Sequence, residues 1–238
     1  MQKQMEMARH QIEILKSLDT EEFYNKDEAE VRKYADPAIQ ELILLGNQVT
    51  MELTELLQTE FTWSCFFSLT ILRQTKDPQA VPALIAFLTR ESDDSMANEE
   101  AMFVLQDIGT PSILPLMEAL DEAFEKKTYH SYLVGALTGI AHAESYEFMV
   151  KITKDFIGKP WRYKGWFRIE DFTYNFVKQG HTDVLPLLQQ LLNMATIAGN
   201  EKREIEETVR ALQDPEGYEQ ELRNMEKELS DAEQKTGV

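Results

Sequence analysis

A short pattern recurs along this chain every 31 to 38 residues: a polar or small turn, then an apolar residue or proline, then a pair of aliphatic residues that opens a helix. The best copies are residues 77–84, 110–117 and 181–188. Weaker copies give a series of equivalent anchor positions at residues 51, 82, 115, 148, 186 and 220. Internal periods of this size indicate stacked repeats, each of one supersecondary unit.

Each anchor predicts a helix with one buried face. Apolar residues stand in most repeats two positions after the anchor and again three positions further, and this spacing places both on one side of a helix. The first set is Leu53, Leu84, Met117, Val150, Leu188 and Leu222, and the second is Leu56, Phe87, Leu120, Thr153, Leu191 and Met225.

Prolines predict where these helices begin. Pro37, Pro78, Pro111 and Pro215 each follow an Asp or Thr, which suits an N-cap oxygen followed by a residue without an N–H in the first turn. Deep in a helix, a proline would remove a backbone hydrogen bond and clash with the preceding turn. We therefore expect each regular helix to start near the second proline, Pro82, Pro115 or Pro186, with a tight turn before it.

Partner helices are predicted between the anchors, because apolar residues recur there at helical spacing. These stripes are Leu69 and Leu72; Val104, Leu105 and Ile108; Leu133, Leu137 and Ile140; Phe172 and Phe176; Ile205, Val209 and Leu212. A single helix pair cannot bury both of its faces, so neighbouring pairs must stack. With no alternating strand pattern, the sequence predicts an all-α fold, an α-solenoid that forms a right-handed superhelix of about six antiparallel helix pairs.

The string Ala80-Val81-Pro82-Ala83-Leu84 resembles the start of the second helix in HEAT-like repeats of the short, bilin-lyase type. Residues 113–117 and 184–188 are near matches, and the resemblance covers about residues 36–230. It implies an armadillo-type superhelix, whereas the activity is left open because one scaffold carries many functions.

Three segments are expected: an N-terminal capping helix and linker at 1–35, the HEAT-like solenoid at 36–230 and a frayed tail at 231–238. Residues 1–18 form an amphipathic helix with Met5, Ile12 and Leu15 among its apolar positions, and residues 19–30 form a loop or a short helix. Polar terminal caps prevent end-to-end stacking of repeats, so we expect a monomer. The alternative is that the Met-rich first helix docks on another subunit.

The net charge of -18 disfavours nucleic-acid binding, because phosphate backbones are bound mainly through Lys and Arg. The acidic excess indicates a solvated surface, or alternatively an acidic groove for a basic protein or peptide. The longest nearly continuous apolar stretch, residues 65–72, is well short of the ~20 residues that span a bilayer. We expect no membrane partner, a cytoplasmic location, and a buried, inert thiol at Cys65.

The basic segment at residues 159–168 is the candidate partner-binding site, and it coincides with the longest anchor spacing. Aromatic and cationic side chains of this kind are typical of interface hot spots. The alternative is that its aromatic residues fill a gap between repeats while Arg168 opens the next helix. The candidate residues are Trp161, Arg162, Tyr163, Lys164, Trp166 and Arg168.

No catalytic, cofactor-binding or metal-binding residues are predicted. None of the four histidines is followed by Glu, as di-iron hydroxylases on this scaffold require, and one cysteine makes a structural zinc site implausible. His142 is interpreted as a capping or surface residue. Carboxylate pairs such as Glu99 and Glu100 are interpreted as solvated.

Three functions remain open. The first is a non-enzymatic scaffold that binds a protein or peptide on the surface of the helices that start at the anchors. The second is a lyase- or chaperone-like role, which the resemblance to bilin-lyase repeats implies. The third is an enzyme acting on nucleic acid, as in HEAT-like glycosylases, for which residues 159–168 could begin a basic, aromatic channel.

Overall fold

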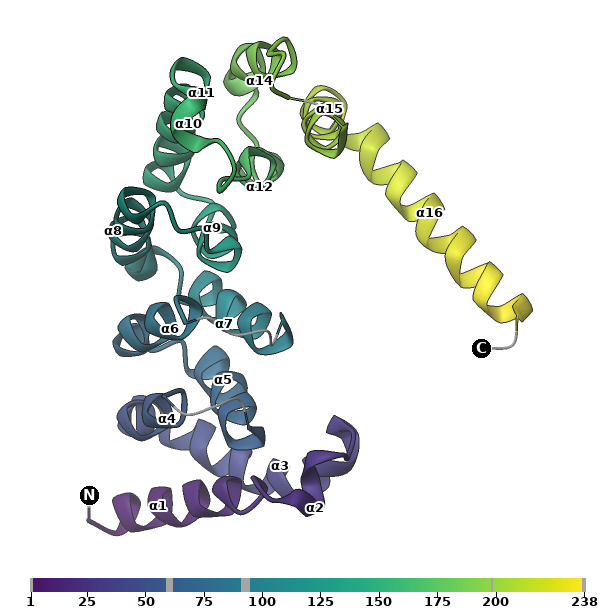
Figure 1. Cartoon of the computed structure of the whole chain (residues 1–238). Helices are drawn as coiled ribbons and strands as arrows, with labels where there is room; N and C mark the ends of the chain where they lie inside the picture. The colour runs from purple at the N-terminus through teal and green to yellow at the C-terminus, as the bar shows by residue number, and fades with distance from the viewer. Residues whose placement is uncertain (1, 59–61, 91–94, 198, 237–238) are drawn as a thin grey trace. The chain divides into compact units, whose positions relative to one another are not determined.

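The chain is all-helical in a computed structural model that describes residues 2–58, 62–90, 95–197 and 199–236 (Figure 1). Helices make up 82% of it, and the described residues contain no strand. The prediction of an all-α fold is therefore confirmed. The chain divides into two compact units, Met1–Ile140 and Ala141–Val238, which are described in turn.

The first unit is built from successive helices that pack on one another. α3, α5, α7 and α9 make contact in that order, while α4 packs on α5, α6 on α7 and α8 on α9. The N-terminal helix α1 packs on α3 and α5. The helices are α1 (Gln2–Lys16), α2 (Glu21–Tyr24), α3 (Glu28–Leu45), α4 (Thr50–Leu56), α5 (Trp63–Thr75), α6 (Val81–Leu88), α7 (Ser95–Ile108), α8 (Thr110–Lys126) and α9 (Ser131–Thr138).

The core of this unit contains the aliphatic stripes that the repeat predicted. Leu53, Leu69, Leu72 and Leu84 are all fully buried. Cys65 is buried as well, as expected. Burying a Leu or Phe side chain contributes about 1.5 to 3 kcal/mol, so this shared core holds the helices together.

Two of the three predicted helix starts at a second proline are confirmed. A 3-10 turn, Pro78–Ala80, precedes α6, which places Pro82 in the first helical turn, and the turn Thr182–Val184 likewise precedes the helix containing Pro186. The Asp77 side chain caps its turn by accepting a bond from the N–H of Gln79 at 3.1 Å. The other carboxylate oxygen of Asp77 accepts a bond from the Thr50 hydroxyl at 2.6 Å, tying the turn to the start of α4.

The predicted start at Pro115 is wrong, because Pro115 lies inside α8. The preceding Gly109 has a φ of +77°, which lets the chain leave α7 and begin α8 directly at Thr110. Pro111 then lies in the first turn, where its missing N–H costs nothing.

The prediction that Pro37 lies in the first turn of a helix is also wrong. It lies inside α3, whose N-cap is Asp27 rather than Asp36, and the Asp27 carboxylate accepts a bond from the N–H of Glu30 at 2.8 Å. The helix continues through the proline because buried residues on both sides, including Val31 and Ile39, keep its apolar face against the core.

The predicted buried register is shifted in α8 and α10. Leu116 and Met149 are fully buried, while the predicted Met117 and Val150 are half-buried. In α8 the cause is the early start at Thr110, since the buried positions Ile113, Leu116 and Leu120 follow from that start.

The second unit is arranged around α10 and α15. α10 packs against α11, α12 and α14, while α15 packs against α12, α13, α14 and α16. The predicted partner helix carrying Phe172 and Phe176 is two short helices, and both phenylalanines are fully buried. The helices are α10 (Ala143–Gly158), α11 (Pro160–Tyr163), α12 (Ile169–Tyr174), α13 (Phe176–Gln179), α14 (Leu185–Leu192), α15 (Gly199–Gln213) and α16 (Pro215–Thr236).

The termini are helical over most of their length. The predicted helix at residues 1–18 corresponds to α1, and α2 is the short helix expected within residues 19–30. At the other end, α16 exposes Leu222 and Met225, which the repeat pattern predicted to be buried. The division into segments 1–35, 36–230 and 231–238 stays a prediction; α3 crosses residue 36 and α16 crosses residue 231.

Candidate functional site

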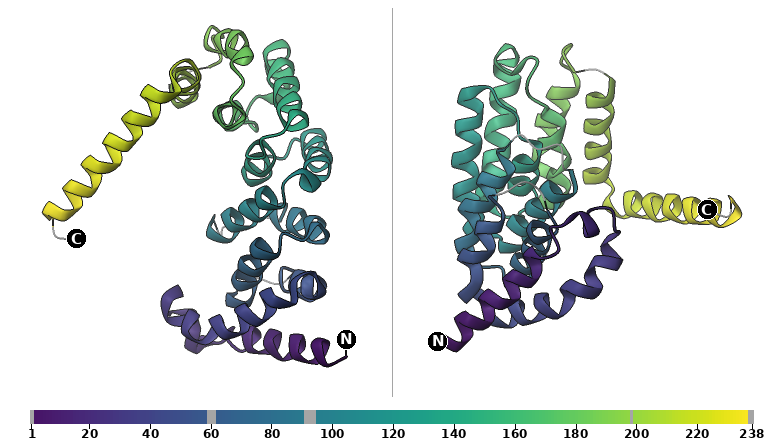
Figure 2. Two further views of the ribbon diagram at one scale, coloured as in Figure 1. Left: turned by 180° about the vertical axis from the view of Figure 1, so that it is seen from behind. Right: turned by 60° about the horizontal axis from the view of Figure 1, so that its bottom comes forward.

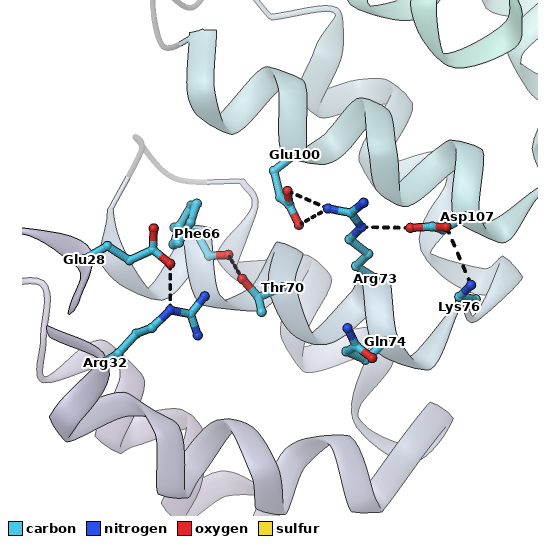
Figure 3. Close-up of a pocket in the computed structure, with 9 residues that line it drawn as sticks. All are labelled: Glu28, Arg32, Phe66, Thr70, Arg73, Gln74, Lys76, Glu100 and Asp107. Carbon is cyan, nitrogen blue, oxygen red and sulfur yellow. Dashed lines mark hydrogen bonds and ion pairs between the residues drawn. The ribbon is translucent and has the colours of Figure 1, made fainter. Parts of the chain in front are cut away.

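A polar pocket of about 580 Å³ opens between α3, α5 and α7 of the first unit (Figure 3). Three carboxylates and three cations line it, together with an amide, a hydroxyl and one aromatic ring. The lining residues are Glu28, Arg32, Phe66, Thr70, Arg73, Gln74, Lys76, Glu100 and Asp107.

Arg73 is the central cation of this polar pocket. From α5 its Nε donates to Asp107 Oδ2 at 2.8 Å, and its Nη1 donates to Glu100 Oε1 and Oε2 at 3.3 and 3.1 Å, both on α7. Its guanidinium also lies 5.1 Å from the ring centroid of Phe103. The hydrogen bond to Asp107 raises the pKa of Arg73, so the side chain is held as a fixed cation that links two helices.

Lys76 adds a second contact to the same carboxylate. Its Nζ lies 3.6 Å from Asp107 Oδ1, so Asp107 bridges Arg73 and Lys76. Glu100, which the sequence interpretation treated as solvated, is instead half-buried beside Arg73. These carboxylates hold the cations in place and neutralise most of their charge locally.

Arg32 forms the opposite wall of the polar pocket, and its ion pairs lie within one helix. Its Nε donates to Glu28 Oε1 at 2.6 Å and its Nη1 to Asp36 Oδ1 at 3.4 Å, both within α3. Figure 3 shows Arg32 approaching from α3, with Thr70, Arg73 and Gln74 along α5 on the other side. Its guanidinium also lies 5.6 Å from the ring centroid of Phe67 on α5. Since its hydrogen-bond partners lie one helical turn away on its own helix, Arg32 can turn toward a bound group without breaking an ion pair between helices.

A smaller pocket of about 190 Å³ lies between α4 and α6 and is more apolar. Ala83, Ala86 and Phe87 are among its lining residues. The guanidinium of Arg90 lies 4.7 Å from the ring centroid of Phe87 and donates to the carbonyl of Leu57. The opening is bounded by two of the helices that begin at anchors, and its volume suits one side chain.

The predicted site at residues 159–168 is split between surface and core. Trp161, at 72% exposure, projects outward from α11, while Tyr163 is 3% exposed and Phe167 is 8% exposed. Trp166 is half-buried and its ring stacks on that of Tyr163, with centroids 5.7 Å apart. Tyr163 is therefore buried, as the gap-filling alternative predicted, whereas Trp161 is exposed, as the partner-binding prediction requires.

The cations of this segment are exposed, and two of them form hydrogen bonds with carboxylates. Arg162 Nη1 donates to Asp155 at 3.0 Å, and Arg168 Nε donates to the buried Glu170 at 3.1 Å. Lys164 is exposed and follows α11. Arg168 occupies the N-cap position of α12, as the alternative interpretation expected.

His142 has the capping role that the sequence indicated. It is the N-cap of α10, and its Nδ1 accepts a hydrogen bond from the N–H of Glu144 at 3.3 Å. Across the described part of the chain, no group of three or more His, Cys, Asp or Glu side chains could hold a metal ion.

The polar pocket was missed at the sequence level because its residues come from three helices far apart in the chain. One local signal was present: residues 35–72 contain no Lys or Arg, and Arg73 ends that stretch as the single charged residue of α5. A partly buried cation is stabilised by nearby carboxylates, which α7 supplies.

Comparison with protein families, with curated proteins and with solved structures finds no match to this chain. Among the helices described, none combines the length and apolar character needed to cross a bilayer.

Proposed function

We propose that this chain is a HEAT-like α-solenoid that acts as a non-enzymatic scaffold and binds a segment of another protein. The successive packing of α3, α5, α7 and α9 within the first unit supports the architecture. The polar pocket supports the binding role.

The observation that carries the proposal is the chemistry of the polar pocket. It presents donors on Arg32 and Gln74, acceptors on Glu28 and Glu100, and one aromatic ring, Phe66. A polypeptide segment also carries both donors and acceptors along its backbone, so it can satisfy such a lining. The Arg73 side chain is already ordered by the carboxylates of α7, so ligand binding loses little side-chain entropy there.

The same lining argues against the two other functions. A tetrapyrrole carrier requires a mainly apolar pocket, whereas Phe66 is the single aromatic or aliphatic residue among the nine that line this one. Nucleic-acid binding requires cations that face phosphate, whereas Arg73 and Lys76 are already paired with carboxylates.

Selection of random dodecapeptides on the immobilised protein tests this function. We expect enriched peptides that bind the wild type and bind Arg32→Ala and Gln74→Ala at least about tenfold more weakly, because pocket side chains dominate binding energy. Both residues contact solvent, so neither change removes a core residue.

Arg203→Ala is the matched control, because Arg203 is an exposed cation on α15 outside the pocket. Peptides that bind all four proteins equally would contradict the proposal, as would the absence of any enriched peptide. Quenching of tryptophan fluorescence by a linear tetrapyrrole at micromolar concentration would favour the lyase- or chaperone-like function instead.

A further inference from the structure

The C-terminal helix α16 carries an apolar stripe with the spacing of a coiled coil. Tyr218, Leu222 and Met225 are separated by four and then three residues, and in the sequence the same alternation continues to Leu229 and Ala232. In a coiled coil, a stripe of this kind faces the partner helix along its whole length, and we call this stripe of α16 the seam. Two of its members are exposed in the structure, Leu222 at 42% and Met225 at 58%.

The described side-chain contacts between α15 and this helix lie near its start. Arg210 of α15 pairs with Glu221 at 3.2 Å, and its guanidinium lies 5.4 Å from the ring centroid of Tyr218. Figures 1 and 2 both draw the later turns of α16 running clear of α10 to α15. Leu222 and Met225, the described members of the stripe after Tyr218, are exposed on this part of α16.

Charges beside the seam determine what can cover it. The heptad positions that flank the seam hold glutamate at five of six places between residues 219 and 235, and Lys235 holds the sixth. Glu219 and Glu221 are exposed on the two sides of Leu222. Flanking charges of a coiled coil set the choice of partner, because they face the flanks of the opposite helix.

A second copy of α16 fits this seam poorly. In a parallel pair, Glu221 of one helix would face Glu226 of the other. In an antiparallel pair, the flank that carries Glu219 would face the same flank of the other helix, and so would the flank that carries Glu221. Both arrangements bring glutamates together, which destabilises the pair. A helix with Lys or Arg on its flanks would instead form attractive pairs in either orientation.

We propose that α16 is a docking helix for a basic amphipathic helix of another protein, which packs along Leu222 and Met225 with its Lys or Arg residues against the flanking glutamates. This surface shares no residue with the polar pocket, so the proposal can hold or fail independently of the peptide-binding function.

A synthetic helical peptide of about three heptads, with Leu along its seam and Lys on its flanks, tests the proposal. Fluorescence anisotropy of the labelled peptide with the full-length protein should show saturable binding that weakens as NaCl rises from about 50 to about 300 mM. The same peptide with Glu on its flanks should not bind.

The double variant Leu222→Ser, Met225→Ser separates seam binding from general attraction to an acidic protein. It should weaken binding at least about tenfold, because apolar anchors dominate helix docking, while circular dichroism confirms retained helicity. Leu114→Ser on α8 is the matched control, since Leu114 is 61% exposed and belongs to the first unit rather than to α16. Arg32→Ala should also leave this binding unchanged.

Three results would overturn the proposal. One is equal binding of the peptide to the double variant and the wild type, and another is no binding at all. The third is a wild-type dimer in sedimentation experiments that the double variant converts to a monomer, because a second copy would then be the partner of α16.

Discussion

The hydroxyl of Tyr163 donates a hydrogen bond of 2.6 Å to Asp155, which fastens α11 to the last turn of α10. The other Asp155 oxygen accepts a bond from Lys159 at 2.8 Å. The hydrogen bond from Lys159, followed by that from Tyr163, lowers the pKa of Asp155, so the carboxylate is ionised at neutral pH. This anchor directs Tyr163 inward and leaves Trp161 on the surface.

Replacing these two aromatic residues should therefore have unequal effects on stability. Tyr163→Ala should lower the free energy of unfolding by about 3 kcal/mol, because it empties a buried site and removes a hydrogen bond. Trp161→Ala should change it by less than about 0.5 kcal/mol, because that side chain is mostly in solvent. Urea denaturation followed by circular dichroism measures both.

Tyr163→Phe isolates the hydroxyl and should cost about 1 kcal/mol. Equal losses for Tyr163→Ala and Trp161→Ala would show that the segment is not anchored through Tyr163.

Leu84 and Leu188 provide a test of the repeat itself. They stand at the same position of the pattern in different units, and both are fully buried. Ala at either site should cost about 2 to 5 kcal/mol. Leu44→Ala, at a side chain that is 81% exposed, is the control and should have little effect. A loss below about 1 kcal/mol at both leucines would show that the predicted equivalence is wrong.

Two glycines should respond in opposite directions to the same substitution. A methyl group on Gly139 would overlap the side-chain amide of Gln106, which donates to the carbonyl of Gly135 at 2.9 Å and so links α7 to α9. Gly139→Ala should therefore destabilise the chain by about 1 kcal/mol. Gly158, at the end of α10, has nothing within 4 Å of that position, so Gly158→Ala should stabilise by about 0.5 to 1 kcal/mol. Thermal denaturation of both variants distinguishes the two cases, and equal shifts would contradict this account.

Helix positions were predictable where local chemistry decides them. Asp77 with Pro78 specifies a capped turn, and Leu84 and Leu188 have the predicted burial. The interpretation failed where a helix began earlier than its second proline. Gly109 allowed α8 to start at Thr110, and the buried register then moved from Met117 to Leu116.

The polar pocket could not be predicted in the same way, because it depends on which helices become neighbours. Arg73 meets Glu100 and Asp107 only after α5 packs on α7. Burial within residues 159–168 likewise depends on the anchor at Asp155, and composition alone does not separate Trp161 from Tyr163. The separate proposal for α16 depends on exposure as well as spacing, since the pattern alone predicted that Leu222 would be buried.

His130 should make stability depend on pH in the neutral to mildly acidic range. Burial lowers the pKa of His130 in the folded chain below its unfolded value near 6.5, so the unfolded chain binds the proton more tightly. Above pH 6.5 both states are neutral and the contribution to stability is complete, and it is lost as the pH falls toward the lower folded pKa. The melting temperature of the wild type should fall between pH 7.5 and 5.5, and His130→Gln should reduce that fall. His10→Gln, at an exposed position in α1, is the control and should keep the wild-type slope. An unchanged slope for His130→Gln would show that another group dominates this pH range.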